Sequence, residues 1–244
     1  GRDEAVRLAS ASEALLRAAE HVTSRLLDMP DWPSLFDWPP AFAELAAVDP
    51  GYSRAIPCSR IDTFYDGDRL AFIELNTDGC SGMTNADAFH DLYGAHVVRH
   101  DDIGLDGCRA WEVMPGVVET LRGCYAEFRA RHAPGMPEHP VVGVLDWPDE
   151  PSAWEFFAVT AACASAGLEA HVVAPADAEY GDGEVRFNGQ RVDMIYRRLL
   201  GVEYAARMSE LEPVTRAFLD RRVCMVGAPR SQIPFSKKLF AFLH

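Results

Sequence analysis

The sequence is poor in basic residues. Its 23 Lys and Arg stand against 37 Asp and Glu, which leaves a formal net charge of −14 over 244 residues. That excess of negative charge repels the phosphate backbone of a nucleic acid, so we expect no nucleic-acid partner. Apolar runs are also short, and none approaches the ~20 residues that cross a bilayer. We therefore expect no membrane partner, and the absence of a secretory pattern at the N-terminus indicates a cytoplasmic location.

Paired cysteines are missing as well. The chain contains six cysteines, spaced 16 to 61 residues apart, and no CxxC motif. This spacing excludes a zinc knuckle and a dense disulfide framework, so we expect reduced thiols. Hydrophobic residues make up 48% of the chain and occur along its whole length, which is typical of a globular protein of one or two domains.

The first half of the chain contains the patterns of long helices. Apolar residues recur at three- and four-residue intervals over 4–27 and again over 111–131, and a weaker pattern covers 41–48. Each of these intervals places apolar side chains along one side of a helix. Residues 132–140 are rich in proline and glycine, so we expect a connector there between two domains.

The second half alternates apolar strand patterns with helical ones. A strand, a helix and a second strand in succession form a βαβ unit, which produces a parallel sheet. Asn188-Gly189 between two short runs indicates a hairpin, and the acidic run 177–184 indicates a loop. The fold class is therefore α/β. The expected elements are strands over 141–145, 169–173, 194–198 and 223–227, helices over 151–167 and 202–222, and hairpin strands over 184–187 and 190–192.

A β-hairpin is also predicted over residues 60–76, because two alternating runs flank Asp66-Gly67-Asp68. If Tyr65 pairs with Arg69, then Asp62 lies opposite Phe72, and Arg60 lies opposite Glu74. The period of two in a strand then places four polar side chains on one face of the hairpin, namely Arg60, Asp62, Glu74 and Asn76.

Two interpretations of this polar face remain open. Carboxylate and amide oxygens are the ligands that Mg²⁺ prefers, and Mg²⁺ is commonly shared with substrate phosphates, so the first is a metal site that acts on a phosphate-bearing substrate. The second is a solvated surface hairpin with a cross-strand ion pair between Arg60 and Glu74.

Three segments together resemble a known family. The hairpin has the pattern Arg-x-Asp followed after eleven residues by Glu-x-Asn, and the loop 77–82 comes next. The segment 192–198 reads Val-Asp-Met-Ile-Tyr-Arg-Arg, and 226–243 begins Val-Gly-Ala-Pro and later contains Ser-Lys-Lys-Leu. In order and spacing these segments are similar to those of the circularly permuted ATP-grasp ligases of the glutathionylspermidine synthase-like family.

The resemblance implies a role for each matching residue. The metal ligands would be Asp62, Glu74 and Asn76, the phosphate-contacting arginine Arg60, and the nucleotide-contacting lysine Lys237. Ser236 and the Gly79-Cys80 pair depart from the family pattern, which leaves the identity of the substrate open. Alternation along the strand sends the two arginines of the 192–198 segment to opposite faces, so at most one of them enters a site. The implied substrate-binding residues are Asp78, Gly79, Cys80, Ser81, Arg197 and Arg198.

The resemblance also implies a domain organisation. Residues 1–140 would form a helical region that carries the metal and substrate hairpin (60–82). Residues 141–230 would form a Rossmann-like, parallel-stranded pre-ATP-grasp domain, and 231–244 would begin the nucleotide-binding half of an incomplete ATP-grasp domain. The half that clamps the nucleotide follows this last segment in the family, so we expect the native chain to continue past His244.

The function implied by the resemblance is ATP-dependent ligation of a carboxylate to an amine through an acyl phosphate. The cofactors would be ATP and Mg²⁺, and the partners would be small-molecule or peptide carboxylates and amines. Two alternatives remain. In the first, the chain would be a non-catalytic α/β module that binds a small ligand. In the second, it would be a thiol hydrolase in which Cys80 is the nucleophile and His90 or His96 is the base.

Overall fold

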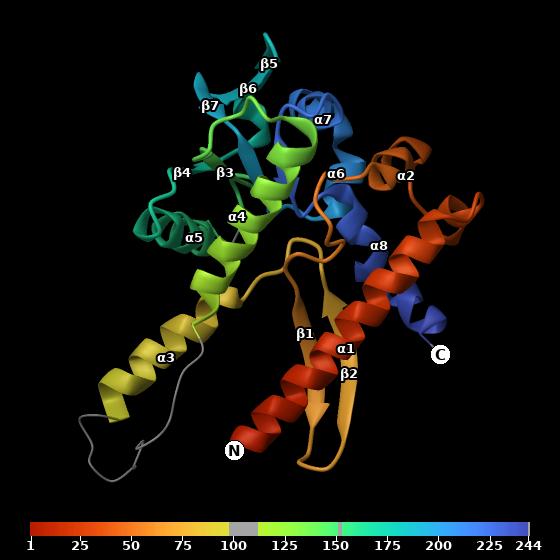
Figure 1. The fold of residues 1–244 in the computed structure, drawn as a ribbon, viewed down its shortest axis with the longest axis vertical. Helices are drawn as coiled ribbons and strands as arrows, with labels where there is room; N and C mark the ends of the chain where they lie inside the picture. Colours follow the sequence, from red (N-terminus) through yellow and green to blue (C-terminus); the bar gives the residue numbers. More distant parts are fainter. Residues whose placement is uncertain (98–111, 151–152, 244) are drawn as a thin grey trace.

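The protein is a mixed α/β fold in a computed structural model that describes residues 1–97, 112–150 and 153–243. It contains a four-stranded parallel sheet, a three-stranded antiparallel sheet and a separate two-stranded hairpin (Figure 1). The described helices are α1 (Arg2–Leu27), α2 (Pro40–Ala47), α3 (Met83–Val97), α4 (Val113–His132), α5 (Ala153–Ser165), α6 (Gly201–Ala206), α7 (Glu212–Leu219) and α8 (Gln232–Phe235). The 3₁₀ helices are η1 (Trp32–Leu35), η2 (Pro175–Asp177), η3 (Met208–Leu211), η4 (Pro229–Ser231) and η5 (Lys237–Phe242).

The parallel sheet has the strand order β4-β3-β8-β9. Its strands are β3 (Val142–Leu145), β4 (Ala170–Val173), β8 (Met194–Arg197) and β9 (Cys224–Val226). The β3-α5-β4 unit confirms the predicted βαβ motif, and β8 pairs in parallel with the other side of β3. The chain therefore leaves β3 toward one edge of the sheet and returns on the other side. This reversal is a topological switch point, where ligands of open α/β sheets usually bind.

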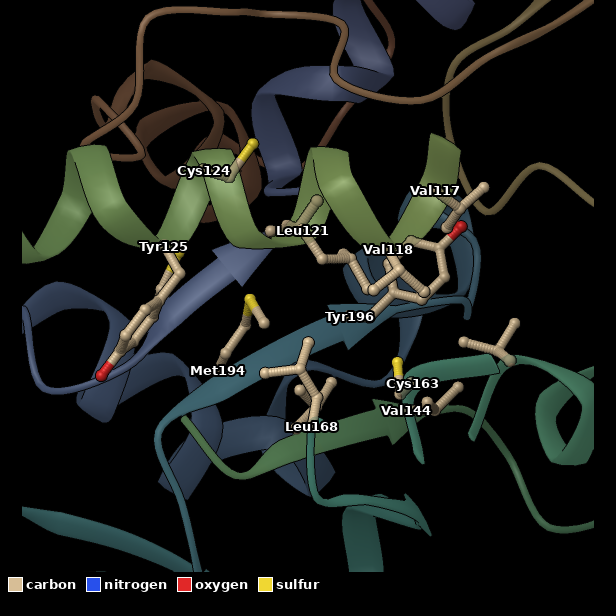
Figure 2. Packing of buried hydrophobic residues seen from close by; sticks show 14 of the residues in the cluster. Val117, Val118, Leu121, Cys124, Tyr125, Val144, Cys163, Leu168, Met194 and Tyr196 are labelled. Carbon is tan, nitrogen blue, oxygen red and sulfur yellow. The ribbon is translucent and has the colours of Figure 1, made fainter. Parts of the chain in front are cut away.

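Helices cover both faces of the parallel sheet. On one face, α4 packs Leu121 and Phe128, both fully buried, against a cluster that includes Val144 and Tyr196 (Figure 2). On the other face, Phe218 of α7 packs with Ile195 of β8. Full burial of one such side chain contributes about 1.5–3 kcal/mol to folding. Because α4 shares a core with the sheet that follows it, these layers pack as one body, and the division at residue 140 stays a prediction.

The antiparallel sheet consists of β5 (Ala178–Gly181), β6 (Glu184–Phe187) and β7 (Gln190–Val192). The predicted Asn188-Gly189 turn joins β6 to β7, and both of its residues have positive φ, as such a hairpin turn requires. The prediction of a loop over 177–184 is wrong, because β5 occupies half of this range and pairs with β6.

The prediction of one continuous helix over 202–222 is also wrong. It is divided into α6, η3 and α7, and α7 has Pro213 in its first turn. Proline has no backbone N–H, and its ring collides with the carbonyl four residues earlier, so a continuous helix through this position is disfavoured. The helices predicted over 4–27, 41–48 and 111–131 are confirmed as α1, α2 and α4. Pro151, expected to begin the α5 helix, lies outside the described residues.

The hairpin of β1 (Arg60–Tyr65) and β2 (Leu70–Asn76) stands beside α1, apart from the parallel sheet (Figure 1). One face of the hairpin is apolar and packs Ile61 and Leu75 against Ala19 of α1 and Leu239 of η5. The segment near the C-terminus is thus attached to both the hairpin and the first helix. None of the described helices is both long and apolar enough to cross a bilayer.

Candidate functional site

The register of the hairpin differs from the predicted one. Tyr65 pairs with Leu70, so the loop has four residues, and Asp66 closes it by accepting hydrogen bonds from the backbone N–H groups of Asp68 and Arg69. The register then shifts between Asp62 and Thr63, at a β-bulge or similar irregularity. The net result is that Asp62 lies opposite Glu74, and Arg60 lies opposite Asn76.

Directly opposed residues of an antiparallel pair point to the same face. The four polar residues therefore share one face of the hairpin, as the alternation predicted, although their individual pairings differ. This face is the one opposite α1. Its continuation toward the loop includes Phe64, which follows Arg60 and Asp62 in the alternation of β1 and is exposed to solvent.

Arg60 and Asp62 form a bidentate ion pair on this face. The Nε and Nη2 atoms of Arg60 donate to the two carboxylate oxygens of Asp62 at 2.9 and 3.2 Å. The guanidinium holds the pKa of Asp62 below its ordinary value, so this carboxylate is ionised at neutral pH. The remaining Nη1 atom donates to the backbone carbonyl of Ser81 at 3.0 Å, which links the hairpin to the loop that follows it.

Glu74 faces a second cation from a distant part of the chain. The Nζ atom of Lys237 lies 3.5 Å from a carboxylate oxygen of Glu74, and the lysine side chain is 71% exposed. Next to it, Asn76 is buried, and within the described part of the chain its Nδ2 meets no acceptor at hydrogen-bonding geometry. The face thus combines two cations, two carboxylates and an amide with unused hydrogen-bonding capacity.

The side chains of Asp62, Glu74 and Asn76 carry oxygens of the kind that a hard divalent cation takes as ligands. All their donor atoms are oxygens if the Asn76 amide turns its carbonyl outward. No cluster of three or more His, Cys, Asp or Glu side chains suited to a metal ion occurs among the described residues. A metal held here would therefore take Asp62, Glu74 and Asn76, and would complete its shell with ligand and water oxygens.

Asp78 and Arg197, both predicted to bind substrate, form an ion pair with each other. Their side chains form an ion pair that is fully buried. Asp78 also accepts hydrogen bonds from Ser231 Oγ at 2.8 Å and from the backbone N–H of Gly201 at 2.5 Å. Arg197 donates in addition to the carbonyls of Gly227 and Leu199. Every charged group of the pair is satisfied within the protein, so both residues position the loop, and their role in substrate binding stays a prediction.

Arg198 points to a different set of partners, as strand alternation predicted. It pairs with the buried carboxylate of Glu155 on α5 and donates to the backbone carbonyl of Cys80. Glu155 in turn accepts from the backbone N–H of Gly82 at 2.6 Å and from Thr84 Oγ1 at 3.1 Å. The arginine and the glutamate together fix the second half of the loop against the sheet.

The remaining loop residues have distinct environments. Gly79 has a φ of +52°, and a Cβ added there would lie 2.3 Å from the carbonyl oxygen of Arg198, so only glycine fits. Cys80 is buried, and burial raises the pKa of its thiol, which argues against a thiolate nucleophile. Ser81 is half-buried and lies between Arg60 and a cavity at the end of the parallel sheet.

Gly79, Ser81 and Arg198 of that cavity are among the predicted site residues, whereas its acidic residues were missed in the sequence. Asp146 directly follows β3, at the carboxyl edge of the parallel sheet, and it lines the cavity together with Glu150, Glu203 and Arg198. The signal that could have found Asp146 is its position, because it follows an apolar strand of a βαβ unit. Glu155 was missed because a carboxylate in the first turn of a helix is usually exposed.

Comparison with known proteins leaves the family open, because no family model matches the chain and no curated protein matches it significantly.

Proposed function

We propose that this chain is an ATP-dependent carboxylate–amine ligase of the ATP-grasp type, or the substrate- and metal-binding part of one. One observation carries the proposal: the fold brings Lys237 from the end of the chain to Glu74 on the hairpin face that also carries Arg60, Asp62 and Asn76. These residues lie in two of the three segments that resemble the ligase family. In the third, Arg197 and Arg198 hold the loop that follows the hairpin.

The proposed reaction has two steps. A carboxylate oxygen of the substrate attacks the γ-phosphorus of ATP, so that a C–O–P linkage forms and the bond to ADP breaks. The amine nitrogen then attacks the acyl carbon, the C–O bond to phosphate breaks, and one proton leaves the nitrogen. The products are an amide, ADP and inorganic phosphate. No side chain of the protein becomes covalently attached in either step.

The residues of the hairpin face would act by binding and positioning. Arg60 would donate to the phosphoryl oxygens, and the exposed ammonium of Lys237 would contact the phosphates of the nucleotide. Asp62, Glu74 and Asn76 would hold Mg²⁺, which would offset the negative charge of the phosphates. The exposed aromatic residue Phe64 extends this face, which is suited to a flat apolar group such as a base.

The finer assignment of the parallel sheet belongs to the same proposal. We infer that the layer formed by β3, β4, β8 and β9 is a pre-ATP-grasp-like domain, with the segment after residue 230 as the start of the nucleotide-binding half. Two features support this assignment. The sheet is parallel and is covered by helices on both faces, and η5 joins the hairpin through Leu239.

The proposal is tested by ATP-dependent phosphate release from the full-length native protein, measured with pools of short peptides as carboxylates and with hydroxylamine as the amine. Hydroxylamine converts an acyl phosphate to a hydroxamate, which is detected by colour with ferric iron. We expect hydroxamate only when ATP, Mg²⁺ and a carboxylate are all present. Asp62→Asn should lower its formation by about two orders of magnitude or more, because a proposed ligand of the Mg²⁺ that offsets the phosphate charge is lost.

The matched control is Asp68→Asn, the same change at the exposed tip of the same hairpin. It should leave hydroxamate formation unchanged. Phosphate release that needs no carboxylate, or that Asp62→Asn and Asp68→Asn alter equally, would contradict the proposal. Saturable ligand binding by a chain that hydrolyses no ATP would favour the alternative of a non-catalytic binding module.

A further inference from the structure

A cavity of about 140 Å³ opens at the carboxyl ends of β3 and β8. These two strands flank the topological switch point of the parallel sheet, the position where open α/β sheets bind their ligands. Residues from the sheet edge, from the loop after β2 and from α6 contribute to its wall, among them Ser81, Asp146, Glu150, Arg198, Leu200 and Glu203.

The most distinctive group in the wall is Asp146, which is 7% exposed. One of its carboxylate oxygens accepts a hydrogen bond of 2.7 Å from the backbone N–H of Trp147. The other oxygen accepts none from any described residue. Burial raises the pKa of Asp146 to about 6, so near neutral pH the group is a charged carboxylate with an unused acceptor in the cavity. A buried carboxylate oxygen without a hydrogen-bond donor is unfavourable, and it indicates that a donor is missing.

The charges around Asp146 select a cation over an anion. Glu150 and Glu203 line the same cavity and raise the pKa of Asp146 further, whereas Arg198 lowers it. The charge of Arg198 is already offset by its buried partner Glu155. Glu203 also accepts a hydrogen bond from the backbone N–H of Leu200, which fixes it in the wall. A phosphate or carboxylate ligand would therefore meet the like charges of Asp146 and Glu203, and a protonated amine would meet an acceptor.

The cavity adjoins the hairpin face through one residue. Ser81 contributes to the cavity wall, and its backbone carbonyl accepts a hydrogen bond from Arg60 Nη1 at 3.0 Å. A ligand in the cavity and a phosphoryl group at Arg60 would thus lie on either side of the loop residue Ser81. In a ligase, the nucleophilic amine and the acyl phosphate need this kind of proximity.

We propose that this cavity binds the protonated amino group of the amine substrate, with Asp146 as its hydrogen-bond acceptor. The substrate role rests on the proposed ligase function, but the binding of a cation does not. A cavity of ~150 Å³ holds a benzene ring, so this one has room for an alkylammonium of about six non-hydrogen atoms. A longer amine would extend toward solvent.

The test is calorimetric titration of n-butylammonium chloride into the chain at about pH 7.5, with no ATP or metal present. We expect saturable binding that Asp146→Asn weakens about tenfold or more, since a hydrogen bond between charged groups is lost. Asp149→Asn, the same change at an exposed position three residues away, is the control and should bind as the unaltered chain does. n-Butanol, which has the same shape without the charge, should not bind.

A second measurement follows the proton. Near pH 6 Asp146 is partly protonated, and a bound cation favours its ionised form, so binding should release protons into the buffer. Titrations in two buffers of different ionisation enthalpy measure that release, which should vanish at about pH 8 and in Asp146→Asn. Equal affinity in Asp146→Asn, or the absence of proton release near pH 6, would overturn the inference. Normal n-butylammonium binding by a full-length native protein that forms no hydroxamate would refute the ligase function and leave the cation site standing.

Discussion

At the scale of single residues, the arginines of the β8 segment are the clearest example of a charge used for structure. Arg197 and Asp78 are 119 positions apart in the chain, and both side chains are completely buried. Two charges removed from water are tolerated only when each makes good hydrogen bonds, and here Ser231 and the Gly201 backbone supply them. The pair therefore specifies where the loop after β2 lies on the sheet.

Asp78→Asn should destabilise the protein strongly, because it leaves the Arg197 guanidinium buried without its counter-charge. Breaking a buried pair by changing one partner costs about 3–5 kcal/mol. Urea unfolding followed by circular dichroism measures the change. Glu212→Gln, which removes one partner of the exposed Arg216–Glu212 pair, is the control and should cost less than about 1 kcal/mol. A similar loss in the two variants would show that the buried pair contributes little.

At the scale of elements, the loop between β2 and α3 is held by contacts to the end of β8. Gly79 lies against the backbone carbonyl of Arg198, and the guanidinium of Arg198 donates to the carbonyl of Cys80. The loop and the strand thus contact each other through main-chain atoms, and no side chain separates them. This close approach is what allows Ser81 to reach both Arg60 and the cavity.

Gly79→Ala should push the loop away from β8, because its Cβ would lie 2.3 Å from a carbonyl oxygen that belongs to the sheet. Gly67→Ala is the matched control, since Gly67 also has a positive φ but has nothing within 4 Å of the added Cβ. Both variants should lose about 1 kcal/mol or more from backbone strain, and Gly79→Ala should lose clearly more. Urea unfolding compares them; equal losses would mean that the close approach carries no cost.

At the scale of the whole molecule, three distant parts of the chain contribute to the hairpin face and to the cavity that adjoins it. The hairpin contributes Arg60, the C-terminal segment contributes Lys237, and the parallel sheet contributes Asp146. The wall of this cavity contains the buried carboxylate of Asp146. Burial raises its pKa, and the same burial makes folding less favourable when the carboxylate is charged. A group of this kind is a cost to stability that function commonly explains.

The stability of the protein should therefore depend on pH through Asp146. Its pKa is raised from 3.8 in the unfolded chain to about 6 in the folded one, so between these values the folded state binds more protons. Stability attributable to this group falls as the pH rises through that window and stays low above it. Asp146→Asn removes the charge and should stabilise the fold by about 1–3 kcal/mol at neutral pH.

Urea unfolding of the variant and of the unaltered chain at several pH values tests this expectation. The difference between them should be near zero at about pH 4 and should grow to its full size by about pH 7. A variant that is less stable at every pH would mean that Asp146 is a structural carboxylate, held by a donor that favours its charged form.

The sequence by itself determined the local elements and one face of the site. Periods of 3.6 and of 2 are properties of neighbouring residues, so α1, α4 and the strands of the sheet could be predicted from spacing alone. The same reasoning placed Arg60, Asp62, Glu74 and Asn76 together, although the predicted register was wrong. The longer loop and the irregularity each shift the register by one residue, and a total shift of two keeps every side chain on its face.

Only the tertiary structure decided which polar residues are free to bind a ligand. Asp78 and Arg197 belong to a motif that suggests substrate binding, yet they satisfy each other across 119 positions. Asp146 belongs to no motif, yet the sheet leaves one of its oxygens facing a cavity. Whether a charge is paired depends on partners far away in the chain. Local spacing carries no information about such contacts, because they form only when separate elements pack.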